Sequence, residues 1–347
     1  MTALLLLAAC ASPAKIKRIH VPSDQGTIAL CPGENAAFKV NARMRNGQRK
    51  TTTGRGRNKL PWKHLRVELD GVPQPAGRLL MPQDPHTSWK RPLELKVWLD
   101  DRPKVSWEGQ VVARYDCAYY LDLRGAPGMR GDSDMSISAE DGEDGRDRGG
   151  ERGGPGRRGQ DGRHGAHGGH AGYGANATVS LTQGEGKTAG LLEARVAYTM
   201  GSTKDTLYYL LDPNNGSLWV DVSGGVGGAG EDGQDGGDGG DGGDGTPSGP
   251  GGQGGDGGDG GSGGDGGVGG SLELLVDAGA ERYADRITLQ ADGGPAGPGG
   301  AGGDAGDGGD GSPEGEPGRE GRRGNSGRPG RPGELLPSRV TPVTPRF

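Results

Sequence analysis

The sequence lacks the short motifs by which many enzyme families are recognised. It holds no P-loop, no Gly-x-Ser-x-Gly elbow, no His-Glu-x-x-His pair and no Cys-x-x-Cys pair. The apolar run at the N-terminus is only about ten residues long, whereas a helix needs about 20 to cross a bilayer. We therefore expect a protein that is not an enzyme, needs no cofactor, binds no nucleic acid and has no membrane-spanning helix.

Cysteine is also scarce, and the first of the three residues has a distinctive setting. Leu7-Ala8-Ala9-Cys10 follows a short apolar run that begins at Leu4. This segment resembles the lipobox of bacterial lipoproteins. The resemblance implies that residues 1–10 form a signal peptide with its lipobox cysteine, that Cys10 carries lipid, and that the chain is exported and anchored in the cell envelope, at the outer membrane or cell surface. Met1 and Thr2 lack the positive charge of an export signal, which leaves the true start codon open.

Cys31 and Cys117 then remain as one expected disulfide in an oxidising compartment. Between them, short stretches of alternating apolar residues are separated by Pro, Gly and Asn, which is typical of a β-sandwich. Four tryptophans in the same interval make the pattern loosely immunoglobulin-like. We expect an immunoglobulin-like sandwich over residues 11–122. Its excess of Lys and Arg indicates either attraction to anionic polymers and lipid headgroups or merely a solvated face.

Glycine is the abundant residue, with 77 of 347 positions. Over residues 224–270 it occupies every third position except Ser248, and most triplets are Gly-Gly-X. This period fits neither a helix nor a strand. It fits a left-handed extended helix with three residues per turn and a rise of about 3.1 Å per residue. The break at Thr246-Pro247-Ser248-Gly249-Pro250 predicts a turn between two antiparallel rods.

The same device occurs three times, over residues 123–174, 224–270 and 291–333. Each copy predicts an outgoing leg, a turn and a returning leg of roughly 60 Å, so that three hairpins give six rods. Residues 175–223 and 271–290 have strand-like patterns, and residues 334–347 form a terminal strand or tail. Asp212-Pro213-Asn214-Asn215-Gly216 predicts a β-hairpin turn. The expected fold is therefore all-β, with a second β-domain from which the six rods project.

Two other structures compete for the glycine tracts. A collagen triple helix also needs glycine at every third position, but proline is sparse in the second copy and a chain that doubles back cannot supply three parallel strands. Disorder is the other alternative, because 77 glycines and 24 prolines approach the composition of unfolded chains. A flexible or collagen-like stalk thus stays open as an alternative.

The Gly-Gly-X repeats resemble polyglycine-II bundles, which are known in arthropod antifreeze proteins and in adhesins at the tips of some phage tail fibres. In the antifreeze proteins the outward positions are weakly polar, whereas here they are mostly Asp and Arg. In the phage adhesins, loops at the rod tips contact the receptor. By that resemblance, the candidate contacts in this chain are Arg146, Arg148, Glu151, Thr246, Pro247, Ser248, Ser312, Pro313 and Glu314.

Charged side chains give a further alternative, a site for ions. The second copy is wholly acidic, with Glu231 and eight aspartates. Residues in one row of a rod stand about 9.3 Å apart, too far to share one ion, so calcium could bind only between rods. The candidate ligands are Asp238, Asp241, Asp256 and Asp259. The same spacing makes His164, His167 and His170 a solvated row rather than a zinc site. Acidic outgoing and basic returning legs in the first and third copies predict either charge pairing between them or charges that merely keep the glycine tract soluble.

Together these features predict a non-enzymatic, lipid-anchored envelope protein that presents a stiff rod bundle for adhesion or as a spacer. Its partners would be the membrane and a cell-surface polymer or protein receptor. The alternative is a module that binds calcium or another ligand through its acidic rods. The oligomeric state is left open.

Overall fold

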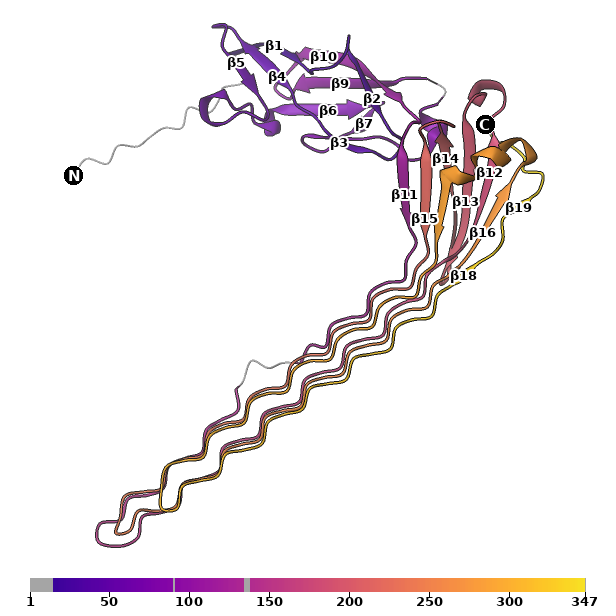
Figure 1. Ribbon diagram of the computed structural model, residues 1–347. Coiled ribbons are helices and arrows are strands. Elements are labelled where there is room, and N and C mark those ends of the chain that lie inside the picture. The colour runs from indigo at the N-terminus through magenta and orange to yellow at the C-terminus, as the bar shows by residue number, and fades with distance from the viewer. Residues whose placement is uncertain (1–14, 90, 134–137, 347) are drawn as a thin grey trace.

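The computed structural model describes residues 15–89, 91–133 and 138–346. The predicted lipidation site, Cys10, lies outside these residues. The fold is predominantly β, as the sequence predicts. Figure 1 shows three parts: an N-terminal group of sheets, a second pair of sheets, and a long bundle of glycine-rich segments that extends from that pair.

The N-terminal unit contains three sheets around one core. Its strands are β1 (Ile16–His20), β2 (Thr27–Leu30), β3 (Asn35–Ala37), β4 (Asn41–Met44), β5 (Arg49–Thr51), β6 (Leu65–Leu69), β7 (Val72–Pro73), β8 (Arg78–Leu80), β9 (Leu93–Leu99) and β10 (Arg102–Ala113). They pair as β1-β4-β5, β2-β10-β9-β6-β7 and β3-β8. Alternate residues of β9 are buried, as the period of two predicts, and they join the core that all these sheets share. Short 3₁₀ turns η2 (Gly56–Asn58), η3 (Trp62–His64) and η4 (Pro85–Thr87) connect strands.

The N-terminal unit ends earlier than the sequence indicates. The first domain is expected to extend to residue 122, but β10 ends at Ala113, and β11 (Ala118–Asp122) pairs in parallel with β15 (Ser217–Asp221) of the second unit. The alternating pattern continues through the break, so it could not mark the boundary. A disulfide joins Cys31 to Cys117, with 6.2 Å between the Cα atoms. It ties the end of β2 to the connection just before β11, and so links the two units covalently.

The second unit consists of two sheets that share a core. The outgoing sheet is β11-β15-β17, all parallel, and the return sheet is β14-β13-β12-β16-β18, with β19 also on β16. The strands are β12 (Asn176–Gln183), β13 (Leu192–Met200), β14 (Thr203–Leu211), β15 (Ser217–Asp221), β16 (Ser271–Val276), β17 (Ile287–Gln290), β18 (Glu334–Leu335) and β19 (Arg339–Val340), with 3₁₀ segments η5 (Gly186–Thr188) and η6 (Ala278–Arg286). Leu181, Leu211, Leu218 and Leu272 are wholly buried between the sheets.

The predicted β-hairpin at Asp212–Gly216 is wrong, because the strands on either side of the turn do not pair with each other. The segment is a turn, since the Asp212 carboxylate accepts the backbone N–H groups of Asn214 and Asn215 at 2.9 and 2.8 Å. However, β14 pairs with β13, and β15 pairs with β11 and β17. The turn therefore carries the chain from one sheet to the other. Local turn chemistry fixes the reversal but not the strand that lies alongside.

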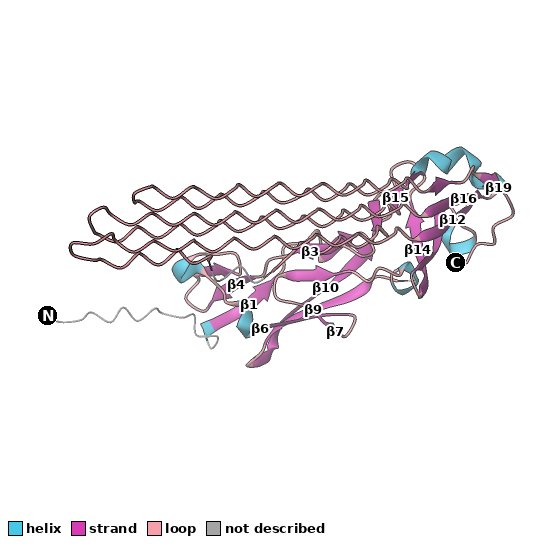
Figure 2. Cartoon of the chain, turned by 90° about the horizontal axis from the view of Figure 1, so that it is seen from below, coloured by secondary structure: helices cyan, strands magenta, loops and turns pink. Residues whose placement is uncertain are grey.

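Six glycine-rich legs continue these strands, as Figure 2 shows where the drawn strands give way to loops. Legs 1, 3 and 5 (residues 125–133 with 138–148, 224–245 and 293–311) leave the outgoing sheet after β11, β15 and β17. Legs 2, 4 and 6 (residues 152–174, 249–270 and 315–333) lead back into β12, β16 and β18. Each set keeps the order of its strands, so the two sheets become the two layers of the bundle.

Backbone hydrogen bonds between legs recur at every third residue. Gly227, Gly230 and Gly233 of leg 3 donate to carbonyls of leg 5, while the next residue in each triplet donates to leg 2. Carbonyls of leg 3 in turn accept from legs 1 and 4. Legs 3 and 4 thus each have four bonded neighbours, whereas legs 1 and 6 have two.

The number of neighbours explains the number of glycines. A Cβ atom on Gly240 of leg 3 would lie 2.3 Å from the Glu143 carbonyl oxygen of leg 1, and one on Gly239 would lie 2.1 Å from the Gly252 carbonyl oxygen of leg 4. Two of the three faces of leg 3 are therefore closed to any side chain, and its triplets are mostly Gly-Gly-X. Legs 1 and 6 lie at the edges of the bundle and have one glycine per triplet.

Candidate functional site

The three turns gather at the end of the bundle that is farthest from the sheets (Figures 1 and 2). The structure therefore brings together the nine residues that the sequence analysis named as candidate contacts. All are exposed except Ser248, which is half-buried: Arg146, Arg148, Glu151, Thr246, Pro247, Ser312, Pro313 and Glu314 face solvent.

Hydrogen bonds hold the turns in one assembly. The Thr246 N–H donates to the Glu151 carbonyl at 2.8 Å, and the Ser312 N–H donates to the Gly249 carbonyl at 2.8 Å. The Arg152 guanidinium reaches the Ser312 carbonyl at 3.1 Å and so connects the first turn with the third. Arg152 was not among the predicted contacts, because only the folded arrangement places it beside a residue 160 positions away. The tip is thus a continuous surface built on backbone that is already ordered.

The aspartate rows on the outgoing layer have a structural role. The Asp238 N–H donates to the Asp141 carboxylate of leg 1 at 3.0 Å, and the Asp238 carboxylate accepts from the Asp307 N–H of leg 5 at 2.8 Å. Likewise, the Asp241 N–H donates to the Asp144 carboxylate, and the Asp241 carboxylate accepts from the Asp310 N–H. Each carboxylate satisfies a backbone donor that faces water and has no carbonyl of another leg in reach. Aspartate at the third triplet position is thereby explained without an ion.

The calcium candidates do not come together. Asp238 and Asp241 bond to the outgoing layer, whereas Asp256 and Asp259 accept the N–H groups of Arg319 and Arg322 on the return layer. Across the described ranges no group of three or more His, Cys, Asp or Glu side chains is arranged to hold a metal ion.

The histidine row belongs to the return layer and continues the same pattern. The Nδ1 atoms of His164, His167 and His170 accept the N–H groups of Asp259, Ser262 and Asp265 at 2.8, 2.9 and 3.0 Å. An acceptor role requires Nδ1 to be unprotonated. These imidazoles are exposed, as the sequence predicts, but they also cap backbone donors of leg 4.

The predicted charge pairing holds for only one hairpin. Arg157 of leg 2 lies 3.1 Å from Glu143 of leg 1. In the third hairpin, the Asp304 N–H donates to the Asp235 carboxylate of leg 3, and the Arg319 N–H donates to the Asp256 carboxylate of leg 4. No ion pair among the described residues joins legs 5 and 6.

Leg 3 has two exceptions to its Gly-Gly-X pattern, Glu231 and Gln234, and both lie between two levels at which legs 1 and 3 pair in different registers. The difference in residue number between hydrogen-bonded residues of legs 1 and 3 is 98 for Gly131 and Ala229 but 96 for Gly142 and Asp238. Glu231 accepts the N–H of Ser133 at 2.9 Å, the Ser133 hydroxyl, and the N–H of Ala166 at 3.1 Å. These hydrogen bonds, that of the Ser133 hydroxyl foremost, hold the pKa of Glu231 below its ordinary value.

Gln234 has a similar role one triplet farther along. Its side-chain oxygen accepts the Arg163 N–H of leg 2 at 3.3 Å. Both side chains thus supply acceptors to residues of legs 1 and 2, at levels between the two registers. The sequence displays both departures from the glycine pattern, but not that they lie side by side.

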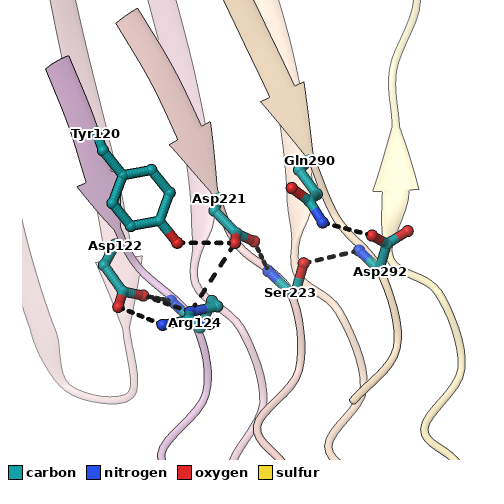
Figure 3. A network of polar contacts seen from close by, with 7 residues as sticks. All are labelled: Tyr120, Asp122, Arg124, Asp221, Ser223, Gln290 and Asp292. Carbon is teal, nitrogen blue, oxygen red and sulfur yellow. Dashed lines mark hydrogen bonds and ion pairs between the residues drawn. The ribbon is translucent and has the colours of Figure 1, made fainter. Parts of the chain in front are cut away.

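Polar side chains mark the junction at which strands become legs (Figure 3). Asp221, only 4% exposed, accepts the Tyr120 hydroxyl at 3.0 Å and the Ser223 N–H at 2.9 Å. The Ser223 hydroxyl then accepts the Asp292 N–H at 3.0 Å. On the neighbouring strand Asp122 accepts the N–H of Arg124 at 3.1 Å, and the Arg124 guanidinium lowers the pKa of the Asp122 carboxyl. These contacts satisfy backbone donors where the hydrogen-bond period changes from two residues to three.

Comparisons with protein-family models, with curated proteins and with solved structures found no match. In the part of the chain that the structure describes, no helix has the length and apolar character needed to cross a membrane.

Proposed function

We propose that this protein is a lipid-anchored adhesin of the bacterial envelope, which uses a polyglycine-II bundle to hold a receptor-binding tip away from the membrane. The N-terminal unit is an immunoglobulin-like module that connects the lipid anchor at Cys10 with the bundle. The chain carries out no reaction in this proposal.

The observation that carries the proposal is the gathering of three turns at the far end of six bonded legs. Each turn is supplied by a different part of the sequence, yet hydrogen bonds join all three. Their exposed charged groups include Arg148, Glu151 and Glu314. A contact surface on ordered backbone loses little conformational entropy when a partner binds. This favours recognition by the tip over a tip that is only the end of a spacer.

A tip variant and a matched leg variant test the proposal. Cells that display the full chain are passed over surfaces coated with envelope polysaccharide or with host-cell protein, and retained cells are counted. The tip variant Arg148→Ala/Glu151→Ala/Glu314→Ala should lose at least about tenfold in retention, as expected if the three changes together remove about 1.4 kcal/mol of binding free energy. The control Arg323→Ala/Glu320→Ala/Glu334→Ala removes the same charges from exposed sites on leg 6 and β18, and should be retained like the parent.

A spacer is the second function that the long bundle favours. Removing one triplet from each of the six legs at the same level shortens the bundle by about 9.3 Å and leaves the tip intact. An adhesin should keep its retention after this change. If retention follows bundle length and ignores the tip variant, the protein is a spacer and the adhesin proposal is wrong.

A further inference from the structure

Three arginines lie in one row across the sheet β1-β4-β5. Arg18 of β1 is directly opposite Arg43 of β4, and Arg43 is in turn directly opposite Arg49 of β5. All three are exposed. Directly opposed side chains on neighbouring strands have Cβ atoms about 4.5–5.5 Å apart, and like charges in this position destabilise a sheet. This row therefore costs the folded protein stability and has no evident structural use.

The surroundings of the row offer no compensating charge. A hollow of about 710 Å³ opens over these strands, and its lining contains no Asp or Glu. His20, Asn41, Thr51 and Asn58 line it beside the arginines. Among the described residues, no ion pair includes Arg18, Arg43 or Arg49. Elsewhere in the same unit, Arg66 and Arg91 each have an aspartate partner.

We propose that this arginine row binds the phosphate groups of an anionic lipid surface. Guanidinium groups bind phosphate through paired N–H donors, and the neighbouring amide and hydroxyl groups can donate to the remaining oxygens. The row includes β1, the first strand among the described residues, which begins at Ile16 and follows the N-terminal segment that contains Cys10.

The location indicates a lipid surface rather than a dissolved phosphate. In the proposed function, on which this inference rests, the lipid on Cys10 holds β1 close to the membrane. Lys15 and Lys17 are exposed beside the row and add positive charge. A lipid chain combined with a basic surface holds a protein at a membrane more firmly than either alone. The row would then fix the N-terminal unit against the headgroups.

Vesicle binding tests the inference without the lipid on Cys10 and without a receptor. The full chain with Cys10→Ser is sedimented with phosphatidylglycerol vesicles, with phosphatidylcholine vesicles, or with phosphatidylglycerol vesicles in the presence of inorganic pyrophosphate. It should sediment with the anionic vesicles only, and salt should release it. Arg18→Gln/Arg43→Gln/Arg49→Gln should weaken vesicle binding by on the order of 100-fold, at about fivefold per arginine.

The control Lys39→Gln/Lys104→Gln/Lys204→Gln removes three exposed positive charges outside the row and should weaken binding by less than about fivefold. The melting temperature of the arginine variant without vesicles should equal or exceed that of the parent, because repulsion is relieved. Equal weakening by both variants would refute the row as the site. Binding of pyrophosphate without binding of vesicles would refute the lipid assignment. Either result leaves adhesion by the tip standing, since the tip is unchanged in this assay.

Discussion

Replacing one interior glycine with alanine tests whether the legs pack as described. Gly240 lies in leg 3, and an alanine Cβ there would be 2.3 Å from the Glu143 carbonyl oxygen and 2.5 Å from its carbonyl carbon. Separations under about 3.0 Å require movement, and here the obstacle is backbone. The Gly240 N–H donates to the Arg157 carbonyl, and the Gly240 carbonyl accepts from Gly252, so a shift of leg 3 weakens bonds to two other legs.

The magnitude follows from these contacts. Overpacking costs about 1–3 kcal/mol, and two weakened backbone hydrogen bonds cost about 1 kcal/mol each. Gly240→Ala should therefore destabilise the protein by about 3–5 kcal/mol. The entropy that alanine removes from the unfolded chain offsets only about 0.4–1 kcal/mol of this.

Differential scanning calorimetry of the full chain measures the effect. The net loss is then about 2–4.6 kcal/mol, so for a unit of this size the transition that contains the bundle should fall by roughly 4–18 °C. Gly149→Ala is the matched control, since a Cβ atom there meets nothing within 4 Å and its φ is not positive. It should leave the transition unchanged or raise it slightly. Equal effects of the two substitutions would mean that leg 3 does not approach leg 1 as described, and would support the flexible stalk instead.

Three further predictions concern side chains. The pKa of Glu231 is lowered in the folded state, so its contribution to stability is present above the pKa of the unfolded carboxyl and is lost as pH falls through the folded pKa. Glu231→Gln should therefore flatten the acid side of a plot of urea midpoint against pH, and an unchanged acid side would contradict this. His164→Lys removes the acceptor for the Asp259 N–H and should lower the free energy of unfolding in urea by about 1 kcal/mol. His164→Asn keeps an acceptor and should cost less, and equal losses would show that this hydrogen bond does not contribute to stability. Cys117→Ser opens a loop with a sequence separation of 86 and should cost up to about 4–5 kcal/mol, measured against reduction of the parent protein, which should give a similar loss.

The local structure of this chain follows closely from its sequence. The strand-like pattern over residues 271–290 begins with β16 (Ser271–Val276), and the turn at Thr246–Pro250 divides leg 3 from leg 4. These features depend on short-range patterns: a period of two, a period of three, and residues that favour turns. Such patterns can be recognised without knowing which other segments of the chain pack against them.

The partners of each element were much harder to predict. The turn after Leu211 leads to another sheet because buried residues on both strands face the core between the sheets, and nothing within the turn encodes this. The capping role of the aspartates depends on which backbone donors face water, and that follows from the arrangement of the legs. Glu231 stands out in its glycine row, but its hydrogen-bond partners are 65 and 98 residues away.

If the protein is held at both ends, as the proposed function requires, the direction of the legs has a mechanical consequence. The backbone hydrogen bonds run from leg to leg, across the long axis of the bundle, at every level from the junction to the tip. A pull on the tip along that axis therefore loads these rows in shear and shares the force among many bonds at once, whereas a sideways pull would open them one after another. Because each leg continues a strand without a linker, the load passes directly into the buried sheets, and the bundle should withstand tension far better than bending.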